Sequence, residues 1–67
     1  MKYAKLRGAI REKLGAEANL AKKLNLNAIT LSKKLNGKAD WKKSEIEKTL
    51  EFLYIPRSEV YEYFFYE

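Results

Sequence analysis

Residues 16–37 read AEANLAKKLNLNAITLSKKLNG, and this stretch decides the fold. Apolar residues recur at helical spacing in its first half and again in its second half, with a polar, asparagine-containing turn between them. Asn36-Gly37 ends the segment. The pattern therefore predicts two short helices, at 17–24 and 28–35, joined by a tight turn.

The turn residues indicate how the two helices are set against each other. Asn27 is a good N-cap, because its side-chain oxygen can accept the free backbone N–H groups of the following turn. Asn25 can adopt the left-handed conformation that ends a helix, and the small Ala21 lets a second helix cross closely. Two helices at a steep angle form a helix-turn-helix, which lays its second helix in a DNA major groove. Spacing alone leaves open an ordinary helical hairpin in a small bundle.

Length and composition exclude several classes of protein. The chain has 67 residues, enough for one domain spanning 1–67, and contains no cysteine and no histidine. It has no Gly-rich phosphate loop, and we expect its carboxylates, including Glu45, Glu47 and Glu51, on the helix surface. We therefore predict no enzymatic activity, no cofactor, no metal site and no small-molecule ligand. No apolar run approaches the roughly 20 residues of a membrane span, so we expect a cytoplasmic protein of a bacterial or phage-infected cell.

Charge is distributed unevenly along the chain. Residues 1–43 hold twelve Lys or Arg residues and three acidic ones, a balance of +9. Residues 44–67 hold two basic and six acidic residues, a balance of −4. The asymmetry indicates a basic face that binds a polyanion and a separate face that contacts something else. The alternative is a lysine-rich surface that only keeps the protein soluble.

Helical periodicity and stop signals extend the prediction to the rest of the chain. Gly15 ends the first helix and Pro56 opens the last, while Gly8, inside the first, suggests close packing against a neighbouring helix. We expect the basic residues Lys5, Arg7, Arg11 and Lys13 on the outer face of the first helix. The prediction is an all-α, compact four- to five-helix bundle with helices at about 2–14, 17–24, 28–35, 43–53 and 56–64.

The segment 60–67 is rich in aromatic residues, a composition that favours strand as much as helix. So many aromatic rings cannot all be buried under one helix face, and an exposed apolar patch usually marks an interface. We predict a homodimer whose interface contains Tyr61, Phe64 and Phe65. Trp41 is expected to anchor the short polar link at 38–40 in the core. The alternative is that its ring is a stacking platform for a base.

Several short motifs together resemble a known group of proteins. They are YAKLRG at 3–8, NGK at 36–38, Trp41 followed by Glu45-Ile46, Ile55-Pro56 and YFF at 63–65. With the central stretch, they resemble small phage Cro- and repressor-type helix-turn-helix regulators. The resemblance implies an all-helical fold and sequence-specific binding of double-stranded operator DNA to regulate transcription.

The resemblance also implies which residues would contact DNA. On the recognition helix, the base-contact candidates are Ala28, Ile29, Thr30, Ser32 and Lys33, and the flanking phosphate-contact candidates are Asn27, Asn36, Lys38, Lys42 and Lys43. Lys33 is as well suited to a phosphate as to a guanine. Lys22, Lys23 and Lys34 belong either to this surface or to a solvated one. Two half-sites about 34 Å apart would match a homodimer.

Two pairs of residues depart from the pattern of that group. The second helix begins with Ala16-Glu17 instead of a capping Thr or Ser followed by Gln, and a carboxylate repels a phosphate. The recognition helix begins with Ala28-Ile29, which cannot hydrogen-bond a base edge. These residues favour an alternative function, a protein-interaction module of antirepressor or antitoxin-like type with weak or lost DNA reading. A redesigned domain of this kind would show the same pattern.

Overall fold

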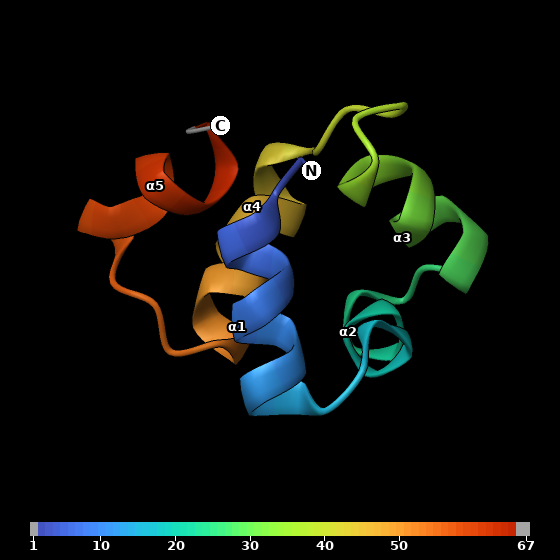
Figure 1. The fold of residues 1–67 in the computed structure, drawn as a ribbon, viewed down its shortest axis with the longest axis horizontal. Coiled ribbons are helices and arrows are strands. Elements are labelled where there is room, and N and C mark those ends of the chain that lie inside the picture. The colour runs from blue at the N-terminus through green and yellow to red at the C-terminus, as the bar shows by residue number, and fades with distance from the viewer. Residues whose placement is uncertain (1, 66–67) are drawn as a thin grey trace.

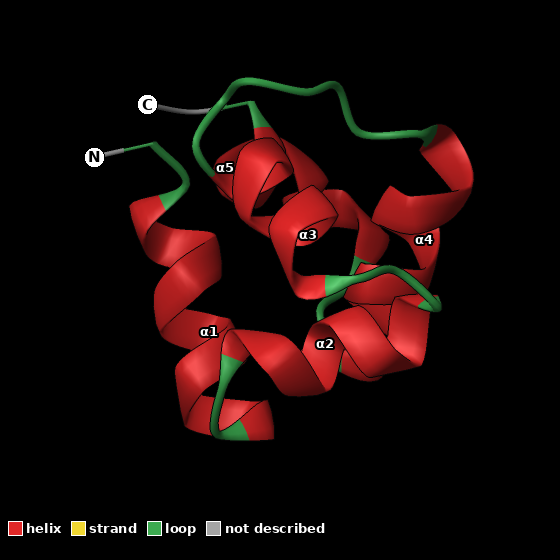
Figure 2. Cartoon of the chain, turned by 90° about the vertical axis from the view of Figure 1, so that its right-hand side faces the viewer, coloured by secondary structure: helices red, strands yellow, loops and turns green. Residues whose placement is uncertain are grey.

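The computed structural model describes residues 2–65, and within that range the chain is all-helical, as predicted (Figure 1). The elements are α1 (Ala4–Leu14), α2 (Glu17–Leu24), α3 (Ala28–Leu35), α4 (Lys43–Phe52), the 3-10 helix η1 (Arg57–Glu59) and α5 (Val60–Phe64). Helices α1 and α4 lie in the middle, with α2 and α3 on one side and α5 on the other (Figure 1). Figure 2 looks onto the α2–α3 side, with α5 behind α3. None of the described helices is long and apolar enough to cross a membrane.

The α2–α3 turn forms as its sequence predicts. Asn25 adopts the left-handed conformation, with φ 59° and ψ 40°, and the Leu26 N–H donates to the Ala21 carbonyl at 2.9 Å. Together with the Asn25 N–H, which donates to the Ala21 and Lys22 carbonyls, this bond pairs carbonyl groups at the end of α2. The Asn27 side chain accepts the Thr30 N–H at 2.7 Å and caps α3. The predicted bounds of both helices are confirmed.

The other helix ends differ slightly from the prediction. Helix α1 begins at Ala4 instead of residue 2, because Tyr3 is left-handed, with φ 59°. Helix α4 ends at Phe52, and the left-handed Tyr54, with φ 56°, turns the chain away. The single helix expected over 56–64 is divided into η1 and α5. The aromatic tail is therefore helical through Phe64, and its last two residues lie outside the described range.

The core is formed by apolar side chains from all five α-helices and from the link after α4. It contains Leu6, Ala9, Ile10, Leu20, Ala21, Leu24, Leu31, Leu35, Leu50, Leu53, Ile55 and Phe64. Trp41 packs against this core, so its predicted anchoring role is confirmed. The packing predicted at Gly8 is wrong, because no atom of a neighbouring element lies within 4 Å of where a Cβ would be.

Candidate functional site

The outer face of α3 carries the predicted base-contact residues. Ala28, Ser32 and Lys33 are exposed, Thr30 is half-buried, and Ile29 has 70% of its surface exposed. The two residues at the start of this face thus present only methyl and methylene groups to a partner. Ser32 and Lys33 are the exposed polar side chains among the five candidates.

The predicted phosphate-contact residues are also exposed, but some of their side chains are already engaged in hydrogen bonds within the chain. The Asn27 oxygen is used as the cap of α3, and Asn36 is part of a polar network described below. Lys38, Lys42 and Lys43 form no ion pair with any part of the chain that the structure describes. These three lysines are therefore cations available to a polyanion, together with the exposed Lys33 of α3, which also forms no ion pair in the described range.

Lys34 and Glu45 are buried, so the prediction that both lie on the surface is wrong. The Lys34 Nζ lies 2.9 Å from a Glu45 carboxylate oxygen and donates to the Asp40 carbonyl at 2.7 Å. Glu45 also accepts the backbone N–H of Lys42 at 2.9 Å, which completes the start of α4. Burial raises the pKa of Glu45, but the Lys42 N–H and the Lys34 ammonium outweigh it, so the pKa lies below its ordinary value. The pair ties α3 to α4.

Arg7 links α1 to the start of α2 and to the end of α3. The prediction that Arg7 lies on the outer face of α1 did not foresee this role. Its Nη1 donates to Glu17 at 2.9 Å, and its Nη2 donates to the Leu35 carbonyl at 2.9 Å and to Asn36 Oδ1 at 2.8 Å. Its Nε donates to the Lys2 carbonyl at 3.3 Å. The position of Arg7 beside the buried Leu6 was the signal available in the sequence, because it places the side chain at the border of the apolar stripe.

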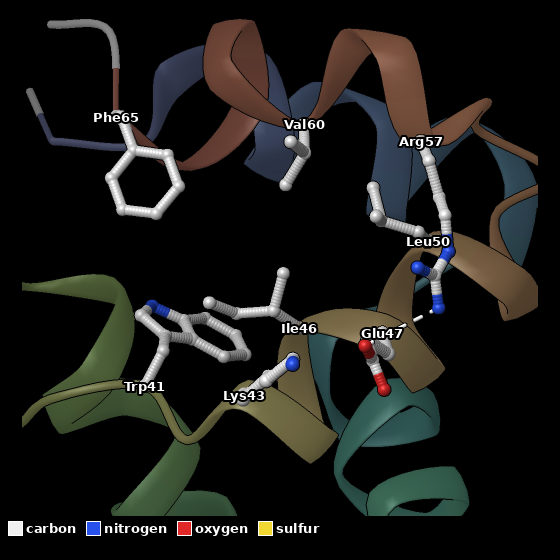
Figure 3. Close-up of a pocket in the computed structure, with 8 residues that line it drawn as sticks. All are labelled: Trp41, Lys43, Ile46, Glu47, Leu50, Arg57, Val60 and Phe65. Atoms are coloured by element: carbon white, nitrogen blue, oxygen red, sulfur yellow. Dashed lines mark hydrogen bonds and ion pairs between the residues drawn. The ribbon is translucent and has the colours of Figure 1, made fainter.

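An apolar groove lies between α4 and the η1–α5 segment (Figure 3). Its volume is about 590 Å³, and it is lined by Trp41, Lys43, Ile46, Glu47, Leu50, Arg57, Val60 and Phe65. Five of these eight residues are apolar, and the charged ones include an Arg57–Glu47 ion pair at 3.2 Å. The buried Trp41 Nε1 has no hydrogen-bond partner among the residues that the structure describes. No pattern in the sequence predicts this groove, because it exists only where the two segments meet.

The aromatic residues of α5 divide between the core and the surface. Phe64 is only 6% exposed and packs edge-on against Trp41, with ring centroids 5.0 Å apart. Its predicted place in a dimer interface is therefore corrected, because its ring belongs to the core of one chain. Tyr61 and Phe65 are 64% and 59% exposed, and their rings lie 6.1 Å apart. These two form the exposed aromatic pair at this end of the molecule.

Comparison with known proteins identifies the family. Residues 1–67 match the family described as protein of unknown function (DUF739). This chain belongs to that family. No curated protein matches the chain. Among solved structures, it is similar to the solution structure of the modulator of repression (MOR) of the temperate bacteriophage TP901-1 from Lactococcus lactis, with 39% identity and a TM-score of 0.83. The match covers 96% of this chain and 86% of that one, so the two share essentially the whole fold.

Proposed function

We propose that this protein is a phage regulator that modulates repression, and that it does so by binding another regulatory protein in the α4–α5 groove. The observation that carries the proposal is the groove itself, which has a mostly apolar lining on a chain with 34% charged residues. Its similarity to a modulator of repression supplies the biological setting. The partner we propose is the repressor of the same phage.

The chemistry of the groove suits a protein partner. Its lining combines two aromatic residues, Trp41 and Phe65, with the aliphatic side chains of Ile46 and Leu50. Aromatic anchors surrounded by apolar contacts are typical of the energetic centre of protein interfaces. The Arg57–Glu47 pair lies among the lining residues and provides a polar margin (Figure 3). An amphipathic helix that lays its apolar face into such a groove is a recurring mode of recognition.

The face of α3 supports a protein target over an operator. Ala28 and Ile29 cannot donate to or accept from a base edge, so the first two residues of α3 offer only apolar contacts. In helix-turn-helix complexes, this part of the recognition helix is the one that contacts bases. A regulator that acts on a repressor protein needs no such contacts.

Titration of the purified repressor against two matched variants tests the proposal. Phe65→Ala removes an exposed aromatic residue of the groove, and we expect a loss of affinity of roughly 30-fold, as for an interface anchor. Tyr54→Asn is the control, because Tyr54 is 85% exposed, lies outside the groove and has a positive φ that Asn tolerates. Equal affinities of the two variants would contradict docking in the groove.

Binding of double-stranded DNA as a homodimer is the second candidate function. The observation in its favour is a set of exposed lysines on and after α3 that form no ion pair within residues 2–65, namely Lys33, Lys38, Lys42 and Lys43. In this proposal, the base contacts are those of Ala28, Ile29, Thr30, Ser32 and Lys33. Selection from a random duplex library at about 150 mM salt tests it, since non-specific binding weakens steeply as salt rises. Enrichment of a two-fold symmetric site supports specific reading, and no enrichment contradicts it.

A further inference from the structure

We infer that Glu17 lowers the affinity of this protein for DNA by neutralising Arg7, a cation that would otherwise face a phosphate beside α3. The inference rests on the proposed function, in which the protein acts on a regulatory protein and has no need to bind an operator. It assigns to Glu17 a role in specificity, the exclusion of a polyanion from a surface that is otherwise basic.

The geometry makes Glu17 the counterion of Arg7. The carboxylate accepts a hydrogen bond from Arg7 Nη1 at 2.9 Å, and the two side chains are 33% and 19% exposed. No other ion pair of Arg7 is found within residues 2–65. A partly exposed carboxylate so close to a guanidinium cancels most of the field that the guanidinium would present to an approaching anion.

The pair is connected to the recognition helix through hydrogen bonds. Arg7 Nη2 donates to Asn36 Oδ1 at 2.8 Å, and Asn36 Nδ2 contacts Ser32 Oγ at 3.3 Å. The chain Glu17–Arg7–Asn36–Ser32 therefore ends on a predicted base-contact residue. It places the Glu17 carboxylate and the C-terminal end of α3 on the same side of the fold.

Arg7 has contacts that do not involve Glu17, which makes the inference testable. Its Nη2 also donates to the Leu35 carbonyl at 2.9 Å, at the end of α3, where the partial negative charge of the helix favours a cation. Replacing Glu17 with Gln keeps an oxygen that can accept from Nη1, but removes the negative charge. The variant thus presents one additional positive charge, held by two contacts independent of position 17.

The experiment compares Glu17→Gln with Glu12→Gln in binding a mixed-sequence DNA duplex over a series of salt concentrations, measured by fluorescence anisotropy. The control makes the same change of net charge at an exposed residue of α1 with no ion pair in the described part of the chain. We expect Glu17→Gln to bind roughly tenfold more tightly than the control. The slope of log affinity against log salt should steepen by about 0.9, the value for one more phosphate neutralised.

A second readout locates the effect at Arg7. In the Glu17→Gln variant, addition of duplex should shift the Arg7 Nε–Hε resonance, and in the control it should not. Glu17→Ala is the alternative variant if Glu17→Gln fails to fold, and amide spectra establish which of them is folded. Equal affinities and equal salt slopes for the folded position-17 variant and Glu12→Gln would overturn the inference.

Repressor binding separates this result from the proposed function. Position 17 is not among the residues that line the groove, so the Glu17→Gln variant should bind the repressor as the unmodified chain does. If Phe65→Ala fails to weaken repressor binding, the proposed docking site is wrong, whatever the DNA measurements show. If the DNA measurements fail while the groove variant behaves as expected, only the role of Glu17 is refuted.

Discussion

Replacing Lys34 with methionine tests the buried link between α3 and α4. The Lys34 Nζ lies 2.9 Å from the Glu45 carboxylate, and the two side chains are only 7% and 10% exposed. Solvent screens such a pair weakly, and removing one partner leaves the other charge buried and unpaired. Methionine retains an apolar stem of similar length, so the change acts mainly on the charge.

The expected loss of stability follows from what remains around Glu45. Breaking a buried ion pair by removing one partner costs about 3–5 kcal/mol. Glu45 keeps its hydrogen bond from the Lys42 N–H, at 2.9 Å, so the loss should lie near the lower end of that range. A domain of this size has a total stability of about 3–10 kcal/mol, so a large part of it would be lost.

Urea denaturation followed by far-ultraviolet circular dichroism measures this loss. Lys33→Met is the matched control, because Lys33 is exposed on the same helix and its replacement should change the stability by less than about 0.5 kcal/mol. The double variant Lys34→Met/Glu45→Gln removes both charges and should be more stable than Lys34→Met alone. If Lys34→Met and Lys33→Met lose the same stability, the reasoning about the buried pair is refuted.

Three further predictions concern pH, backbone entropy and association. The pKa of Glu45 is lowered in the fold, so its contribution to stability should be complete above the ordinary pKa of 4.5 and lost as the pH falls through the folded pKa. Urea denaturation at several pH values measures this loss of stability in acid. In Lys34→Met, the loss should become smaller or change sign. Gly8→Ala should stabilise the protein by about 1 kcal/mol in the same assay, because α1 has open space there, and destabilisation would show a hidden contact. If the exposed aromatic pair forms a dimer, Tyr61→Ala/Phe65→Ala should halve the mass measured by analytical ultracentrifugation, and an unchanged dimer mass would exclude this interface.

Local sequence signals predicted α2, α3 and the turn between them well. The conformations of Asn25 and Asn27 depend on their own side chains and on the next few residues, so their roles could be inferred without knowledge of the rest of the fold. The left-handed Tyr3 and Tyr54 were not foreseen, because tyrosine has no intrinsic preference for that conformation.

The polar links between helices could not be predicted in the same way. Arg7 and Asn36 are 29 positions apart, and their contact depends on how α1 crosses the end of α3. Helical periodicity also treats lysine and glutamate as surface residues, so it misassigned the buried Lys34 and Glu45, which are tolerated in the interior as a pair. In the five-residue helix α5, less than two turns define the inward face, which is why Phe64 was taken for an interface residue.

The position of Trp41 gives the protein a built-in optical reporter. It is the single tryptophan of the chain, it lines the apolar groove, and its ring packs edge-on against Phe64, with ring centroids 5.0 Å apart. A molecule that binds against Trp41 in the groove is expected to change the surroundings of the indole, and the resulting shift in emission can be measured without a label. Candidate partners, peptides and small compounds can therefore be screened on the unmodified protein by intrinsic fluorescence, with the five tyrosines as a background excited only at shorter wavelengths.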